Sequence, residues 1–122
     1  MGGIMANPGD DVNYKLTQGD TFSLELEYKD ENEEPINLTG FSIQLEVRDK
    51  PGSKKLSASC TIGDGITVTS AVNGIMLIEI SPAKTRMFPY PRAAYQVQIT
   101  DQYDANTTLL QGWFVVNAGV IE

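Results

Sequence analysis

The sequence predicts an all-β fold, a sandwich of two antiparallel sheets with one short helical turn. The first observation is strict alternation, because Phe22, Leu24, Leu26 and Tyr28 are separated by polar residues, as in a strand with one buried face. The second is that about eight such short segments follow one another with turn signals between them and almost no helical pattern. The third is a hydrophobic content of 41%, which is enough for a core that two sheets share.

The expected elements follow from alternation and turn chemistry along the chain. Asn73-Gly74 is a strong hairpin signal. Ser81 as N-cap and Pro82 at the first helical position predict a helical turn, which Pro89 ends. The strands are expected at residues 12–16, 21–29, 41–48, 57–62, 66–68, 75–80, 94–99 and 108–117.

One local feature favours an immunoglobulin-like sandwich. Residues 93–97, Ala-Ala-Tyr-Gln-Val, follow the helical turn and begin an apolar strand. Immunoglobulin-like domains place their tyrosine corner in this setting, and Val97 would then stand where an antibody has its cysteine. Tyr95 is therefore interpreted as a tyrosine corner, with an ordinary core tyrosine as the alternative.

Length and charge set the domain organisation and exclude several partners. The 122 residues fit one domain at 12–122, preceded by a flexible N-terminal arm at 1–11. A net charge of -7 argues against binding nucleic acid or anionic membranes, which need clustered cations. No apolar run is long enough to span a membrane, and the N-terminus lacks the features of a signal peptide. With one cysteine, the chain has no pair for an intrachain disulfide.

The residue types predict a protein that is not an enzyme and that needs no cofactor or metal. Histidine is absent, so Ser-His-Asp and Cys-His mechanisms are excluded, as are histidine metal sites. Cys60 lies on an apolar strand face and is expected to be buried rather than nucleophilic. Two weaker alternatives are a calcium site in the acidic turn at 30–34 and a pair of loop aspartates acting as a glycosidase.

Some strands are apolar on both faces, which suggests contacts with partners. If Met76 points inward, its neighbours Ile75 and Leu77 point outward; if Trp113 and Val115 point inward, Phe114 and Val116 point outward. Residues 87–91 add an apolar corner. The candidate interface residues are Ile75, Leu77, Met87, Phe88, Tyr90, Phe114 and Val116. Aspartate at position 77 or 114 should then block assembly and leave the fold intact; the alternative is that neighbouring strands or the arm cover these residues.

A series of short motifs in a fixed order suggests a family. They are Gly19-Asp20-Thr21-Phe22, Asn37-Leu38-Thr39-Gly40-Phe41, Val47-Arg48, Asn73-Gly74-Ile75, Ser81-Pro82-Ala83-Lys84-Thr85, the strand containing Tyr95, and Leu109-Leu110-Gln111-Gly112. The chain resembles, over residues 14–120, a family of small tailed-phage virion proteins, and is similar to the immunoglobulin-like N-terminal module of phage baseplate upper proteins. Asn37 stands where this pattern usually has aspartate.

The resemblance implies a non-enzymatic structural or adaptor protein of a tailed bacteriophage particle, in its baseplate, tail, neck or decoration. It implies a location in the virion after synthesis in the host cytoplasm. The expected partners are other phage structural proteins in multiple copies, with self-association as a further option. The alternative function is a carbohydrate- or host-surface-binding module in which Tyr90 and Tyr103 supply stacking surfaces.

Overall fold

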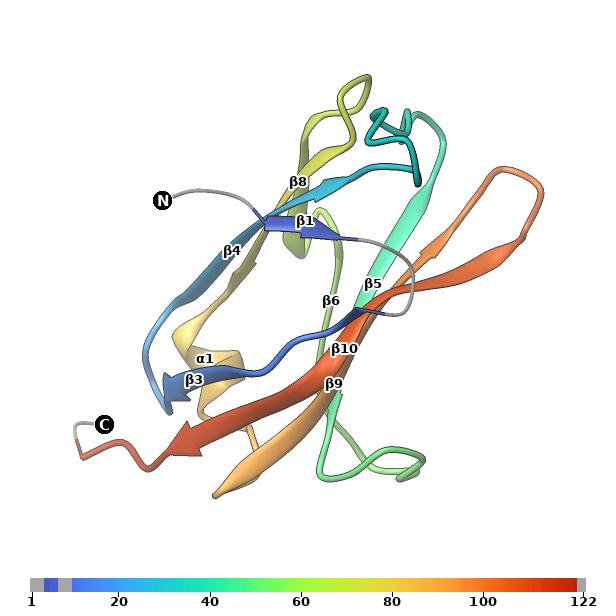
Figure 1. Ribbon diagram of the computed structural model, residues 1–122. Coiled ribbons are helices and arrows are strands. Elements are labelled where there is room, and N and C mark those ends of the chain that lie inside the picture. The colour runs from blue at the N-terminus through green and yellow to red at the C-terminus, as the bar shows by residue number, and fades with distance from the viewer. Residues whose placement is uncertain (1–3, 7–9, 121–122) are drawn as a thin grey trace.

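The computed structural model describes residues 4–6 and 10–120, and these form an all-β domain with one short helix (Figure 1). The elements in chain order are β1 (Ile4–Ala6), β2 (Asp10–Asp11), β3 (Tyr14–Thr17), β4 (Phe22–Tyr28), β5 (Ser42–Arg48), β6 (Leu56–Ile62), β7 (Gly65–Ser70), β8 (Ile75–Ile80), α1 (Pro82–Thr85), β9 (Arg92–Thr100) and β10 (Asn106–Asn117). All eight strands expected from the sequence are present, and the helix lies where Ser81-Pro82 predicted it.

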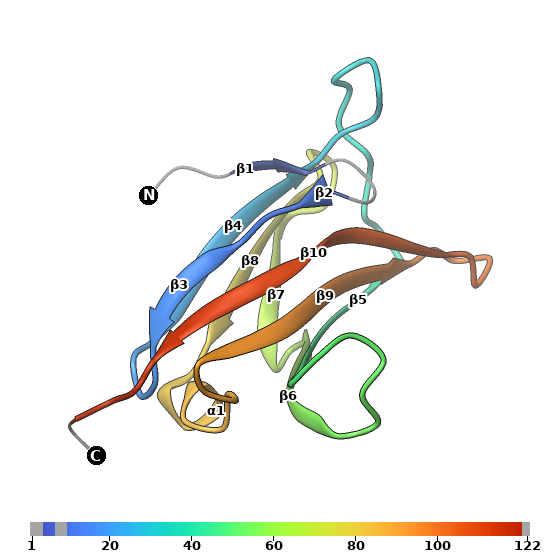
Figure 2. The ribbon, with the colours of Figure 1, turned by 60° about the horizontal axis from the view of Figure 1, so that its bottom comes forward.

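The strands form two layers (Figures 1 and 2). One layer has the order β1-β4-β8-β7, and the other has the order β6-β5-β9-β10 with β2 and β3 beside β10. In chain order these positions correspond to strands A, B, E and D of an immunoglobulin-like domain against C′, C, F and G. The predicted immunoglobulin-like sandwich is therefore confirmed.

The pairing is mixed rather than purely antiparallel. The N-terminal strands run parallel to their neighbours, β1 to β4 and β3 to β10. β6 and β7 also pair in parallel over two residues each, beside the turn at 63–64, which makes the hydrogen-bonded path continuous from one layer to the other. The main antiparallel pairs are β4·β8, β7·β8, β5·β6, β5·β9 and β9·β10.

Two short strands fall inside the segment that the sequence predicted to be a flexible arm. Residues 4–6 pair with β4, and residues 10–11 pair with β10. Neither strand carried a sequence signal, because each is too short to show a period. Residues 1–3 and 7–9 of the arm lie outside the described residues.

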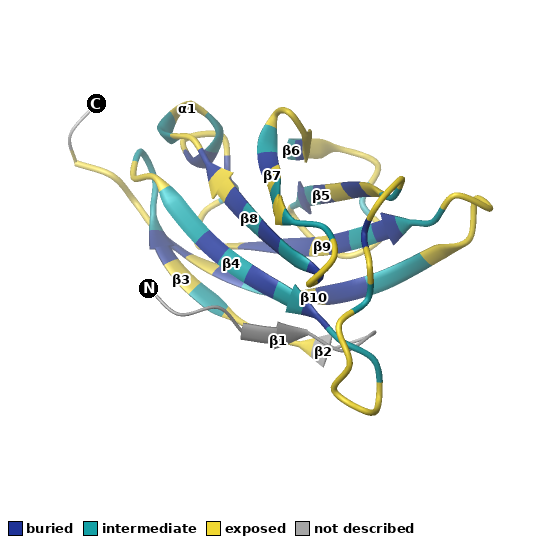
Figure 3. Cartoon of the chain, turned by 90° about the horizontal axis from the view of Figure 1, so that it is seen from above, coloured by how far each residue is buried: buried dark blue, intermediate teal, exposed yellow. Residues whose placement is uncertain are grey.

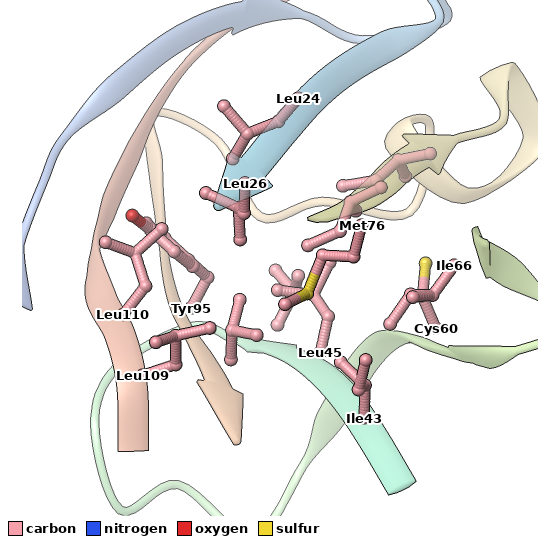
Figure 4. Close-up of a cluster of buried hydrophobic side chains, with 14 of the residues drawn as sticks. Leu24, Leu26, Ile43, Leu45, Cys60, Ile66, Met76, Tyr95, Leu109 and Leu110 are labelled. Carbon is pink, nitrogen blue, oxygen red and sulfur yellow. The ribbon is translucent and has the colours of Figure 1, made fainter. Parts of the chain in front are cut away.

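The core lies between the two layers, and its alternating pattern is clearest in β4, β5 and β8 (Figure 3). Met76, Ile78 and Ile80 point inward from β8 as expected, and Ile75 and Leu77 are half-buried on its outer face. Cys60 is buried at the end of the core near α1, as predicted, and burial raises the pKa of its thiol. Side chains from both layers meet in the close-up of Figure 4.

A bulge in β10 reverses the inward phase expected for the last strand. The register passes from Thr108 opposite Gln98 to Leu110 opposite Val97, so Leu109 is an extra residue in β10. Leu109 and Leu110 are both buried, and every later side chain switches face.

The bulge corrects the assignment of four side chains. Phe114 and Val116 point into the core, whereas Val115 is 45% exposed and Trp113 is half-buried on the outer face. The sequence-based prediction that Phe114 and Val116 face outward is wrong. Aspartate at position 114 would place an unpaired carboxylate in the core and should unfold the domain rather than only block assembly.

The helix α1 forms for the local reasons that the sequence indicated. The Ser81 hydroxyl accepts a hydrogen bond from the Lys84 backbone at 3.3 Å, and Pro82 occupies the first turn. The Lys84 ammonium reaches the β6–β7 turn and donates to the Ser59 carbonyl at 2.7 Å and to an Asp64 carboxylate oxygen at 2.8 Å. Partial burial alone would lower the pKa of Lys84, but the hydrogen bond that its ammonium donates to Asp64 and the neighbouring charges raise that pKa overall. This lysine therefore fixes α1 to the opposite layer.

Candidate functional site

The described residues bring together no group of three or more acidic, cysteine or histidine side chains that could hold a metal ion. In the acidic turn at 30–34, one Asp30 oxygen accepts hydrogen bonds from the backbone of Asn32 and Glu34, at 2.9 and 3.0 Å. That carboxylate therefore closes its own turn. Within the same described part of the chain, no helix has the length and apolarity needed to cross a membrane.

A groove of about 450 Å³ lies on the outer face of β5, β9 and β10. Sheet register explains its shape, because two rows of outward side chains cross these three strands. Glu46, Gln96 and Gln111 form one row, and Arg48, Ala94 and Trp113 form the next. Ala94 has a small side chain and lies between an arginine and a tryptophan. The middle of the second row is therefore hollow, and this hollow is the groove.

Residues 12–13 of the N-terminal segment contact β10 next to the groove. Gly112 faces the point where Val12 crosses β10, and a Cβ at position 112 would overlap the Val12 carbonyl oxygen. The Trp113 backbone N–H donates to the Asn13 side-chain oxygen at 2.9 Å, and the Val12 N–H donates to the Gln111 carbonyl at 2.9 Å. Glycine at 112 is therefore required by this close approach.

Charged side chains lie on both sides of the groove, beside Trp113 on β10 and on β5 opposite it. The Arg92 guanidinium lies over the Trp113 ring, 4.3 Å from its centroid, in a cation–π contact. Arg48 pairs with Glu46 at 2.9 Å and also donates to the Ser53 carbonyl at 2.9 Å, so it holds the 49–55 loop against the groove. The groove thus presents an aromatic ring, two amides and an arginine–carboxylate pair. This set suits recognition of a polar surface.

Tyr95 lies under the groove, in the core, and is not a tyrosine corner. Its hydroxyl donates a 2.6 Å hydrogen bond to the carbonyl of Val12, which is 83 residues earlier, rather than to backbone a few residues upstream. Its ring packs on Phe114 with centroids 4.6 Å apart. Burial raises the pKa of the Tyr95 hydroxyl. The alternative interpretation, a core tyrosine, is the one that the structure shows.

The seven candidate interface residues separate into a surface group and a core group. Ile75 and Leu77 lie on the outer face of β8, opposite Glu27 and Glu25 of β4. Two more are exposed at one end of the sandwich, Met87 at 66% and Tyr90 at 64%. The remaining three, Phe88, Phe114 and Val116, are buried.

The prediction that Phe88 faces outward is wrong, because the loop after α1 turns this side chain into the core. Its ring lies 5.3 Å from that of Phe114, and the Gln18 side chain donates to its carbonyl at 3.0 Å. Met87 and Tyr90 on either side of it point away from the core. The apolar corner is therefore split between core and surface.

Reasoning from the sequence missed the groove. Gln96 and Glu46 are polar positions in alternating strands, which indicated that they face outward. Their position beside Trp113 depends on which strands are neighbours in space, and β5 is far from β9 and β10 in sequence. In addition, the bulge in β10 reverses the direction that was expected for Trp113. The available signal was a tryptophan in the last strand, with Gln111 two residues before it and Gln96 in the preceding strand.

The architecture and the groove define the class of the protein as an immunoglobulin-like β-sandwich with an open outer sheet face. No family model matches the chain, and no curated protein matches its sequence. Among solved structures, it is similar to the N-terminal domain of ORF48 of phage TP901-1, with a TM-score of 0.56 and 13% identity, covering 93% of this chain and 92% of that one. Extracellular domains 3–5 of Drosophila OTK give a TM-score of 0.39 at 17% identity, covering 91% and 35%. The phage likeness shows a shared fold.

Proposed function

We propose that this chain is a non-enzymatic structural or adaptor protein of a tailed-phage particle that acts through contacts with other particle proteins. The observation that carries the proposal is the likeness to a phage protein domain over nearly the whole length of both chains. The order of short motifs described for the sequence points to the same class. The baseplate, tail, neck and decoration positions are alternatives within this proposal.

The surface supports a role in contacts. Ile75 and Leu77 form an apolar strip on an outer sheet face, and Met87 and Tyr90 are exposed at one end of the sandwich. Methionine and aromatic side chains are enriched where proteins meet, and apolar side chains on an outer face often mark such contacts. These four residues are the proposed contact residues, and a rigid sandwich would hold them at fixed separations.

The copy number of the protein in purified particles of the source phage tests the proposal. Quantitative mass spectrometry against the major capsid protein should give a reproducible whole-number ratio, and its value distinguishes a neck or baseplate ring from a decoration on every capsomer. Absence of the protein from purified particles would overturn the proposed role.

A matched pair of variants tests the contact strip. Leu77→Asp is expected to reduce incorporation into particles while the isolated domain stays folded, because Leu77 is only half-buried on an outer face. Thr67→Asp is the control, since Thr67 lies directly opposite Leu77 on β7, is exposed, and gains the same charge. Equal incorporation of both variants would exclude the strip as a contact.

A saccharide-binding module is a second candidate, favoured by the groove. Trp113, Gln96, Gln111 and Glu46 place a ring beside amide and carboxylate groups, which is the combination that stacks on and hydrogen-bonds to a sugar. Titration of glycans against Trp113 fluorescence tests it directly, because this is the single tryptophan of the chain. A glycan array and a titration that both show no signal would exclude this role.

A further inference from the structure

The charges of the domain are separated along its long axis. Loops 29–41 and 71–74 lie side by side at one end of the sandwich, here called the acidic end, and the 101–105 loop projects from the same end, with Gln102 near Gly40 (Figures 1 and 2). These loops contain six carboxylates and one lysine: Asp30, Glu31, Glu33, Glu34, Asp101 and Asp104, with Lys29. This end therefore has a clear negative charge.

The opposite end, here called the basic end, consists of loops 18–21, 49–55 and 81–91, the turn at 63–64 that α1 contacts, and the two strand residues that flank them. Seven of the nine lysines and arginines are there: Arg48, Lys50, Lys54, Lys55, Lys84, Arg86 and Arg92. The carboxylates of the same segments are Asp20, Asp49 and Asp64. Within residues 4–6 and 10–120, two of the seven cations are paired, Lys84 with Asp64 and Arg48 with Glu46. This end is positive in a chain whose net charge is -7.

Each end also exposes large apolar side chains among its charges. Tyr103 is 85% exposed at the acidic end, together with Val72. Met87 and Tyr90 are exposed at the basic end, as described above. Interfaces commonly combine an aromatic or methionine anchor with a charged rim, and complementary rims steer the two surfaces together. The two ends therefore have the composition of two halves of one interface.

We propose that copies of this chain associate head to tail, with the acidic end of one copy docked on the basic end of the next. The inference rests on the proposed function and identifies one partner as a second copy. Because the two surfaces differ, the contact is heterologous and produces either a closed ring or an open row.

The net charge of -7 does not prevent this contact at moderate salt. A strand of seven residues spans about 23 Å at ~3.3 Å per residue. The Debye length is about 10 Å at 0.1 M salt, so each end is screened from the far end of its own molecule. At contact, each loop therefore interacts with the opposite charges that face it, and the repulsion between whole molecules is weak.

Sedimentation velocity and equilibrium at about 0.1 M and about 1 M salt test the proposal, since the higher salt shortens the Debye length to about 3 Å. The wild-type protein should show concentration-dependent association at the lower salt that is lost at the higher. The basic-end variant is Lys50→Glu with Lys54→Glu and Lys55→Glu. The acidic-end variant is Glu31→Lys with Glu33→Lys and Glu34→Lys. Each variant alone should associate roughly tenfold or more weakly, because like charges then face each other.

The decisive sample is a mixture of the two variants. One variant carries negative charge at both ends and the other carries positive charge at both ends, so the mixture should associate much more strongly than either variant alone. The control is Glu25→Lys with Glu79→Lys, which raises the net charge by four, two for each substitution, against six for the acidic-end variant. Its substitutions lie on the outer face of β4 and β8, and it should associate at least as well as the wild type.

Three results would overturn the inference: a wild-type protein that stays monomeric, a mixture that does not associate, or a control that dissociates as fully as the end variants. Circular dichroism of each variant checks that it is folded. The copy number in particles separates this inference from the proposed function. A particle component that is monomeric in solution would leave the proposed function in place and assign the two ends to other proteins.

Discussion

Truncation of Phe114 to alanine should destabilise the domain strongly. Phe114 is 2% exposed, and its ring centroid lies 4.6 Å from that of Tyr95, 5.2 Å from Phe22 and 5.3 Å from Phe88. Phenylalanine to alanine in a core costs about 3–5 kcal/mol in total, and three aromatic partners place Phe114 in the upper part of that range. We therefore expect a loss of about 4–5 kcal/mol in the free energy of unfolding.

The neighbouring residue supplies the control. Val115 is 45% exposed on the outer face of β10, so Val115→Ala should change the free energy of unfolding by less than about 1 kcal/mol. Urea unfolding followed by circular dichroism measures both. With a slope of about 2 kcal/mol per molar urea, Phe114→Ala should lower the midpoint by about 2 M. A larger loss for Val115→Ala than for Phe114→Ala would show that the strand faces are reversed and that the bulge at Leu109 is not formed.

Three further predictions concern the same region. Tyr95→Phe should lower the free energy of unfolding by about 1–3 kcal/mol, because the Val12 carbonyl loses its 2.6 Å hydrogen bond. Tyr14→Phe should be neutral or stabilising, since no described residue bonds to the buried Tyr14 hydroxyl. Urea unfolding compares the two variants. Gly112→Ala should cost about 2–4 kcal/mol by thermal and urea unfolding because its Cβ overlaps Val12, and an unchanged midpoint would refute the close approach. Burial raises the pKa values of the Cys60 thiol and the Tyr95 hydroxyl above their ordinary values of 9.0 and 10.0. As pH rises, the unfolded chain therefore loses these protons before the folded domain does. The stability that the two protonated groups contribute is complete below pH 9 and should fall as pH rises from there. Urea midpoints from pH 7 to 11 measure this fall, and Tyr95→Phe should reduce it.

Local patterns were sufficient for the elements of the fold. Alternation in residues 22–28 and 42–48 predicted strands whose buried faces are as expected, because a period of two depends only on neighbours in sequence. The Ser81-Pro82 pair predicted α1 because a helix cap is a short-range interaction. The immunoglobulin-like arrangement was predicted from the setting of Tyr95 as a tyrosine corner; the arrangement is present, although Tyr95 bonds to Val12 and is not a corner.

The candidate site was only partly predictable from the same patterns. Ile75 and Leu77 were assigned to the outer face correctly because β8 is regular. Phe114 and Val116 were assigned to the wrong face, since a single bulged residue reverses the phase and leaves no mark in the composition. Phe88 was misplaced because the loop after α1 folds its side chain into the core, which no period describes.

The sequence by itself therefore determined the all-β class, the approximate positions of eight strands, the cap of α1, the burial of Cys60 and the absence of histidine chemistry. These depend on residue identity and on spacing along the chain. Only the tertiary structure decided which strands lie side by side, the phase of β10 after Leu109, the partner of the Tyr95 hydroxyl, and the separation of acidic and basic loops to opposite ends. Each of these is set by contacts between residues far apart in sequence, such as the 83 positions between Val12 and Tyr95. Such contacts form only where the packing of the whole sandwich compensates the entropy of ordering the chain between them.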